Sequence, residues 1–264
     1  MSDRIHWTKE SFRDLVLTLH SHFVGIHGEL RKDKKIESFM LSAFLMSVDG
    51  VKLIVTAGHS ILWVQIALNA GFKLHRPYIV DGKGNDASFP GFPYSWNDMS
   101  PWTAAASEED GGFDFGVLRP YDNILQNLDK SGKVFLPEGA WDAPDPACPK
   151  YLLYGSPANR NVFKRDFAKV QTNTYVVDRL PKRPEDFPEP IAETLYGVVS
   201  GTESIKGNSG GPIFAVNDWG TYQLVALQSR WLAGTREIAA PLIRPLGHKL
   251  TEFMRKGSEW PYMH

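Results

Sequence analysis

The stretch that most constrains the fold is residues 38–59, where two strand-like runs flank an Asp-Gly pair. The run "SFMLSAFLMSV" (38–48) is followed by Asp49 and Gly50 and then by "VKLIVTAGH" (51–59). An Asp-Gly pair suits the tight turn of a two-residue β-hairpin, because both residues tolerate positive φ. The stretch therefore predicts a long antiparallel hairpin early in the chain.

Most other apolar runs are also short and lie between turns that contain glycine or proline. Helical periodicity is confined to the two ends, residues 8–20, where Thr8 is a suitable N-cap, and residues 243–257. Many short strands with a helix at each end predict an all-β architecture of antiparallel β-barrels. We expect further strands at 21–30, 113–120, 150–157, 166–177, 194–201, 211–216 and 222–229, an irregular region at 81–110, a connection at 121–149 and a proline-rich loop at 180–190.

Charge and cysteine content exclude several classes of protein. A net charge of −1 gives no electrostatic attraction for nucleic acid or for an anionic membrane, and no apolar run is long enough to span a bilayer. The single cysteine, Cys148, can form no internal disulfide, and the N-terminal residues lack the features of a secretory signal. We therefore expect a cytoplasmic location. The histidines show no metal-binding motif, so we expect neither a metal nor a cofactor.

The segment "SIKGNSGGPIF" (204–214) surrounds one serine with glycines. A serine hydroxyl needs a neighbouring base to act as a nucleophile, and its attack on a carbonyl needs donors for the oxyanion that forms. Glycines beside Ser209 let the chain curl so that the N–H groups of Gly207 and Ser209 converge. The alternative is a plain turn between strands, since glycine, asparagine, serine and proline all favour turns.

A histidine and an aspartate stand in contexts that suit such a serine. His59 follows the end of an apolar strand beside the small residues Ala57 and Gly58, where it can reach into a cleft. Asp114 is a lone carboxylate within "GGFDFGVL" (111–118), and its burial there is costly unless it is paired. The alternatives are a surface histidine and an aspartate on an exposed face of its strand.

The order His59, Asp114, Ser209, in these contexts, resembles the chymotrypsin-like (trypsin-like) serine peptidases over about residues 22–256. "VTAGH", "DFGVL" and "GNSGGP" are similar to the family's T-A-A-H, D-[aliphatic]-A-[aliphatic]-L and G-D-S-G-G-P boxes. The resemblance implies that Ser209 attacks the scissile carbonyl, His59 moves its proton, and Asp114 orients the imidazole. It also implies an oxyanion hole made by the N–H groups of Gly207 and Ser209.

The same resemblance implies one peptidase domain over residues 1–264, with the catalytic cleft between two six-stranded antiparallel barrels. The first barrel would span about residues 22–120 and the second residues 150–242, with the connection at 121–149 and a C-terminal helix at 243–257.

The chain departs from the secreted members of this family in two ways. It cannot form an internal disulfide, and in this it resembles the intracellular bacterial members. Asn208 stands where secreted members have an aspartate that pairs with a new N-terminus, so the box is similar to that of the Deg/HtrA-like branch. We expect no PDZ domain, because fewer than ten residues follow the predicted C-terminal helix. We also expect Asn208 to hold its loop through neutral hydrogen bonds, and activity that needs no cleaved N-terminus.

Substrate specificity is the finer expectation. By the resemblance, Glu203 would lie at the base of the pocket for the residue before the scissile bond and would favour Arg or Lys there. The alternative is that Glu203 points to solvent. Residues 224–230 would supply the strand that pairs with substrate backbone, with Gln228 and Ser229 as candidate substrate-binding residues whose register stays open.

The sequence thus predicts a serine endopeptidase that acts on protein or peptide substrates, under the control of an activating or inhibiting protein partner. A pseudoprotease that acts as a binding module, and an esterase that uses the same site, are the alternatives. Trp96 and Trp102 make the region 81–110 a candidate regulatory loop, although tryptophans also serve as packing anchors.

Overall fold

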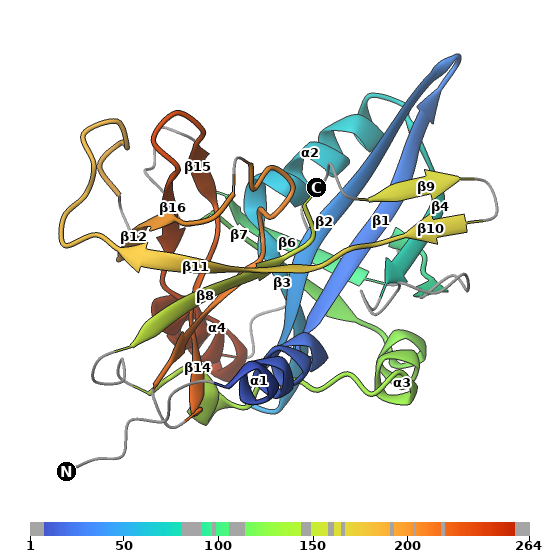
Figure 1. Cartoon of the computed structure of the whole chain (residues 1–264). Helices are drawn as coiled ribbons and strands as arrows, with labels where there is room; N and C mark the ends of the chain where they lie inside the picture. Colours follow the sequence, from blue (N-terminus) through green and yellow to red (C-terminus); the bar gives the residue numbers. More distant parts are fainter. Residues whose placement is uncertain are drawn as a thin grey trace, which may run out of the picture.

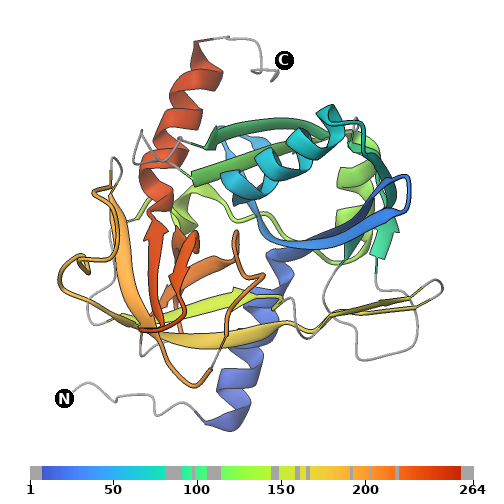
Figure 2. The ribbon, with the colours of Figure 1, turned by 90° about the horizontal axis from the view of Figure 1, so that it is seen from above.

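The computed structural model describes residues 8–80, 91–96, 99–105, 114–143, 149–157, 161–164, 167–190, 193–202, 204–217 and 220–256. Two antiparallel sheets, one from each half of the chain, pack against each other (Figure 1). Figure 2 shows the two sheets side by side, with the C-terminal helix running out from the second. The predicted all-β, two-barrel architecture with a helix at each end is confirmed.

The first sheet has seven strands in the order β5-β4-β1-β2-β3-β7-β6. The predicted hairpin is its centre, with Val48 paired to Val51 across a turn in which Asp49 has φ 47° and Gly50 has φ 78°. The strands are β1 Phe23–Lys32, β2 Lys35–Val48, β3 Val51–Ala57, β4 Lys73–Val80, β5 Gly91–Pro93, β6 Met99–Ala105 and β7 Asp114–Pro120.

The second sheet also has seven strands, in the order β14-β13-β8-β11-β12-β16-β15, beside a separate hairpin of β9 and β10. The implied count of six strands for each barrel was wrong, because short strands of three residues, β5 and β15, extend the two sheets at their edges. The strands are β8 Lys150–Gly155, β9 Val162–Lys164, β10 Phe167–Lys169, β11 Asn173–Arg179, β12 Thr194–Val199, β13 Pro212–Val216, β14 Tyr222–Leu227, β15 Arg230–Leu232 and β16 Glu237–Pro241.

Helices are not confined to the two ends of the chain. The predicted terminal helices exist as α1 (Lys9–Ser21), capped by Thr8, and α4 (Ile243–Arg255). Two helices were missed, α2 (Gly58–Asn69) and α3 (Asp122–Lys130) in the connection, which also contains the 3₁₀ turn η3 (Glu138–Ala140). α2 is apolar nearly all round, with exposed Trp63 and Ile66, so its sequence has no polar face to reveal a helical period. No helix in the described part of the chain is long and apolar enough to cross a membrane.

A core between the two sheets fixes their relative position. It joins Phe44, Val55 and Phe115 of the first sheet to Leu152 and Phe214 of the second, all buried. Each sheet also has an apolar core of its own. Side chains that lie where the two sheets meet are therefore positioned by the same packing that holds the sheets together.

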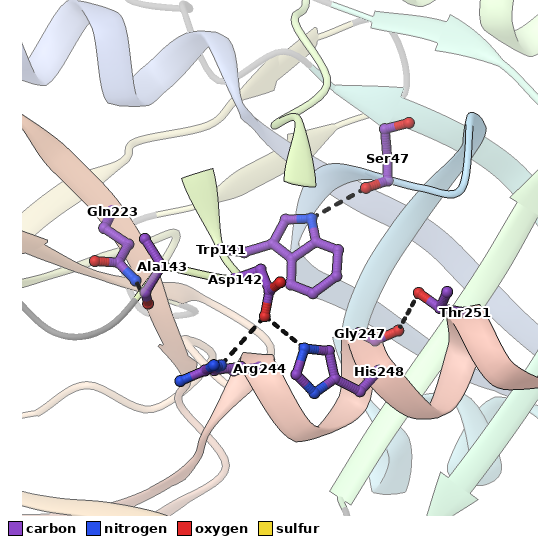
Figure 3. Close-up of polar contacts among 9 residues, drawn as sticks. All are labelled: Ser47, Trp141, Asp142, Ala143, Gln223, Arg244, Gly247, His248 and Thr251. Atoms are coloured by element: carbon purple, nitrogen blue, oxygen red, sulfur yellow. Dashed lines mark hydrogen bonds and ion pairs between the residues drawn. The ribbon is translucent and has the colours of Figure 1, made fainter. Parts of the chain in front are cut away.

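The connection also anchors α4 (Figure 3). Asp142 Oδ1 accepts hydrogen bonds from Arg244 Nε at 3.2 Å and from His248 Nε2 at 2.5 Å. The neighbouring Trp141 is buried and donates from Nε1 to the backbone oxygen of Ser47 on β2, at 3.0 Å. The connection thus links the C-terminal helix to the first sheet.

The region expected to be irregular, 81–110, contains the strands β5 and β6, and β6 pairs with β7. That expectation was wrong for 91–93 and 99–105, where pairing to neighbouring strands overrides the proline and glycine content. Trp96 packs against the core of the first sheet, as a packing anchor would. The side chain of Trp102 and residues 81–90, 97–98 and 106–110 lie outside the described residues.

Candidate active site

His59 lies where a buried strand turns into a helix. β3 ends at Ala57, and His59 is the second residue of α2. The side chain of Ala57 cannot cap the helix, so the first N–H groups need another acceptor. The His59 ring is about half exposed, with 51% of its side chain accessible. It therefore lies at the surface and not in the packed core.

Asp114 supplies the missing acceptor and also holds the ring. It is the first residue of β7, which pairs with β3 next to His59. Its Oδ1 accepts the backbone N–H of His59 at 2.7 Å, and its Oδ2 lies 2.5 Å from His59 Nδ1. A carboxylate at a helix N-terminus is also favoured by the helix dipole. With Nδ1 engaged, Nε2 is the ring nitrogen left to exchange a proton.

A third donor, Ser229, completes the shell around this carboxylate. Its Oγ donates to Asp114 Oδ2 at 2.5 Å. Burial alone would raise the pKa of Asp114, but the hydrogen bonds from His59 and Ser229 and the attraction to His59 outweigh it and lower that pKa below its ordinary value. Asp114 is therefore a carboxylate at neutral pH. Sequence reasoning had named Ser229 without this contact, which joins strands remote in sequence.

Ser209 lies in a turn of the second sheet that is pressed against the first. The next residue, Gly210, donates its N–H to the backbone oxygen of Gln228, at 2.8 Å. A Cβ added to Gly210 would lie only 2.9 Å from the backbone nitrogen of Ala57. Ser209 is thus flanked by the segments that carry His59 and Ser229. Between the described side chains of Ser209 and His59 the structure has no hydrogen bond.

The turn around Ser209 leaves two backbone donors unused. Gly207 has φ 93°, a conformation that favours glycine. Asn208 N–H donates to the backbone oxygen of Ile205 at 3.0 Å, whereas the N–H groups of Gly207 and Ser209 bond to no other described residue. Two unpaired N–H groups on either side of one residue can hold a negatively charged oxygen.

The side chain of Asn208 does not behave as expected. It is fully buried against Gly155, and neither its Oδ1 nor its Nδ2 has a hydrogen-bond partner among the described residues. The prediction that this amide holds the loop through neutral hydrogen bonds was wrong. The backbone of Asn208 holds the loop instead, because its carbonyl oxygen accepts the N–H of Gly211 at 2.7 Å.

A cavity of about 500 Å³ adjoins His59 and Asp114 on the side of the second sheet. Its wall is mixed, because aromatic, proline and aliphatic side chains lie beside the charged Asp186 and Arg230. Phe187 and Asp186 come from the proline-rich loop at 180–190. β15 borders the cavity and, among the described strands, is the last of its sheet and is bonded only to β16. The lining includes Phe187, Pro188, Tyr196, Trp231 and Leu232.

The three residues proposed for substrate specificity lie in different surroundings. Glu203 lies outside the described residues. Gln228 is buried and its backbone is bonded to the Ser209 turn, because its N–H donates to the Gly211 oxygen at 2.9 Å. Ser229 lines the cavity and contacts Asp114. Within the described ranges, no group of three or more His, Cys, Asp or Glu residues could hold a metal ion.

Comparison with known proteins supports the fold. No protein-family model matches the chain, and no curated protein sequence matches it. A thermostable serine protease from an extremophilic microorganism is similar over 91% of this chain and 99% of its own, with 14% identity and a TM-score of 0.50. The active form of the Rv3671c protease from M. tuberculosis is similar over 99% of this chain and 93% of its own, with 14% identity and a TM-score of 0.49. At 14% identity, the likeness to the thermostable protease shows a chymotrypsin-like fold and leaves the activity open.

Proposed function

We propose that the protein is a serine endopeptidase in which His59, Asp114 and Ser209 form the catalytic triad. The observation that carries the proposal is the double engagement of His59 by Asp114, through the ring and through the backbone. It is joined by the N–H groups of Gly207 and Ser209, which bond to no other described residue. A charged, oriented imidazole partner and preformed oxyanion donors are what acyl transfer by serine requires.

The reaction follows from these groups. Ser209 Oγ bonds to the scissile carbonyl carbon while the hydroxyl proton passes to His59 Nε2. The oxyanion that forms accepts hydrogen bonds from the N–H groups of Gly207 and Ser209. The C–N bond then breaks as Nε2 gives the proton to the leaving amine. Water attacks the acyl-enzyme, its proton passes to Nε2, and the C–Oγ bond breaks as the proton returns to Oγ. Asp114 stabilises the imidazolium in both halves.

Substrate would bind along the free edge of the second sheet. β15 follows Ser229 directly and has one unpaired edge, so an extended peptide can add to it as a further strand. The adjoining cavity would take a side chain of that peptide, with Phe187, Tyr196 and Trp231 contacting its apolar part and Asp186 and Arg230 its polar groups. A preference for Arg or Lys before the scissile bond rests on Glu203 alone and is part of the proposal.

A catalytically silent binding module is the second candidate, and one observation favours it. Ser209 and His59 share no hydrogen bond in the structure, as would hold for a site that has lost its chemistry. Catalytic hydrogen bonds are often long in the absence of substrate, however, and form only in the complex. The intact Asp114–His59 pair favours the enzyme. Esterase activity would use the same groups.

Covalent labelling separates the candidates. We expect a fluorophosphonate probe to label the full chain, and Ser209→Ala and His59→Ala to abolish labelling and peptide cleavage. Ser204→Ala is the matched control, because its Oγ accepts only a nearby N–H, that of Lys206, in the same turn. An intact, folded wild-type protein that is neither labelled nor active on a peptide library, both alone and together with any protein that co-purifies with it, would refute the proposal. Esters cleaved without peptides would favour the esterase.

We further propose that the peptidase works in the cytoplasm under control by a protein partner. The single cysteine supports a reducing compartment, since the chain cannot rely on an internal disulfide. An uncontrolled peptidase would endanger other proteins there. Size-exclusion chromatography of the tagged protein from cell extract, with mass spectrometry of what co-elutes, tests for such a partner.

A further inference from the structure

Ser42 connects the first sheet to the turn that carries Ser209. It lies on β2 and is fully buried. Its Oγ donates to the backbone oxygen of Gly207 at 3.2 Å and accepts the backbone N–H of Ser156 at 3.0 Å. Both partners belong to the second half of the chain. One hydroxyl therefore ties the two halves together beside the unused N–H of Gly207.

The backbone of Ser42 makes a second link to the same turn. Its oxygen accepts a hydrogen bond from Thr56 Oγ1 at 2.7 Å, and Thr56 lies on β3, three residues before His59. Gly210 sits directly on this pair, because a Cβ there would lie 2.1 Å from Thr56 Oγ1 and 2.2 Å from the Ser42 oxygen. The serine turn is thus held against the first sheet at two points, Gly207 and Gly210.

The bond to Gly207 matters because glycine does not fix its own conformation. Gly207 has φ 93°, and glycine adopts positive and negative φ about equally well. Its carbonyl and its N–H lie on either side of the same Cα. Rotation of the chain at Gly207 would turn the N–H away from Ser209 at little intrinsic cost. The carbonyl belongs to the peptide after the Gly207 Cα and the N–H to the peptide before it. A hydrogen bond to the carbonyl therefore opposes rotation about ψ of Gly207, one of the two rotations by which the peptides on either side of this Cα can reorient.

We propose that Ser42 is a positioning residue for the oxyanion hole, which holds the Gly207 N–H toward the reacting carbonyl. The proposal rests on the proposed function. The first sheet would then make two contributions to the site. It supplies the His59–Asp114 pair, and through Ser42 it also positions the Gly207 turn of the second sheet. The alternative is that Ser42 only contributes to packing between the sheets.

A matched serine separates these roles. Ser156 is also fully buried, but its Oγ lies within hydrogen-bond distance of Asn161 Oδ1 and of the Gln171 backbone oxygen, both in the second half of the chain. Ser156→Ala therefore removes a buried hydroxyl without touching Gly207. Ser42→Cys is a second variant, in case Ser42→Ala does not fold. Its thiol fills the site with a slightly larger group that is only a weak donor.

Kinetics give the first readout. We expect kcat of Ser42→Ala and Ser42→Cys to fall about tenfold, less than the 10²–10³ that follows loss of an oxyanion donor itself, with KM unchanged. The inhibition constant of a peptide boronate, which mimics the tetrahedral intermediate, should rise in parallel. Ser156→Ala should lose as much thermal stability as the Ser42 variants but keep kcat within about threefold of wild type. A fall in kcat as large for Ser156→Ala as for the Ser42 variants would overturn the proposal.

Crystal structures of the same variants give a readout that does not need turnover. We expect the Gly207 carbonyl to rotate and the Gly207 N–H to leave its wild-type direction in the Ser42 variants, and both to keep their orientation in wild type and Ser156→Ala. A Gly207 peptide that is unchanged in both Ser42 variants would overturn the proposal whatever the activity. An inactive wild type whose Gly207 rotates in the Ser42 variants would refute the peptidase and still support the positioning role.

Discussion

Gly210→Ala is the substitution that most directly tests how the Ser209 turn is held. Gly210 has φ 90°, and an added Cβ would lie 2.1 Å from Thr56 Oγ1 and 2.2 Å from the backbone oxygen of Ser42. The threonine hydroxyl can move, but the backbone oxygen belongs to a buried central strand. The turn itself must therefore shift, and it would move away from the strand that leads to His59.

The size of the effect follows from two separable costs. Alanine at positive φ costs about 1–2 kcal/mol relative to glycine. Forcing an extra carbon into a filled site adds about 1–3 kcal/mol. Gly50→Ala isolates the first cost, because Gly50 has φ 78° and nothing within 4 Å of an added Cβ. Restriction of the unfolded chain is similar for both alanines and cancels in the comparison.

Urea denaturation of the two variants measures the difference. We expect Gly210→Ala to be about 1–3 kcal/mol less stable than Gly50→Ala, or roughly 2–4 °C lower in Tm for each kcal/mol. Peptide cleavage should fall in Gly210→Ala and persist in Gly50→Ala. Equal stability of the two variants would refute the reasoning, because it would mean that the turn has room which the contact distances deny.

Further predictions address individual side chains. Asp114→Asn should lower kcat about 10⁴-fold at nearly unchanged Tm, because the amide oxygen still accepts the His59 N–H while the ring loses its acceptor; a loss under tenfold would point to another acid. Asn208→Asp buries a carboxyl group without a partner, so its pKa should be raised. The variant should be as stable as wild type below about pH 4, where the group is neutral, and about 4 kcal/mol less stable by about pH 8. Urea denaturation at both pH values checks whether the variant loses stability as pH rises. A gain in stability with rising pH would contradict the prediction and indicate a cation near Asn208. Burial lowers the pKa of His22 from 6.5 despite its bond to the Val134 oxygen, so stability should fall as pH drops below 6.5, less steeply in His22→Gln. Denaturation midpoints between pH 7 and about pH 5 test this, and parallel curves would contradict it.

The sequence predicted the parts of the fold that depend on local patterns. The hairpin around Asp49 and Gly50 was predicted because its turn chemistry and its flanking strands agree. α2 was missed for the opposite reason, since an apolar sequence such as "SILWVQIAL" fits a buried strand as well as a helix. What decides the helix is its end. Asp114 accepts the His59 N–H there, from a strand 55 residues further along the chain.

The candidate site divides in the same way. His59, Asp114 and Ser209 each stand in a short recognisable segment, so sequence reasoning named all three. Ser42 and Ser229 stand in ordinary strand sequence. Their importance comes from what the fold brings to them, the Gly207 oxygen in one case and Asp114 in the other. No local pattern marks a buried serine whose partners lie more than 100 residues away.

This division has a consequence for how such a site can fail. Asp114 holds His59 through bonds within the first sheet, between neighbouring strands. The Ser209 turn is held through Ser42 and Gly210, by contacts between the two sheets. A small displacement of one sheet relative to the other would therefore leave the Asp114–His59 pair intact and release the oxyanion donors first. Any partner that acts on the docking of the sheets would control the proposed acyl transfer without touching the proposed base, His59. It would also need no new N-terminus, for which the neutral Asn208 offers no charge.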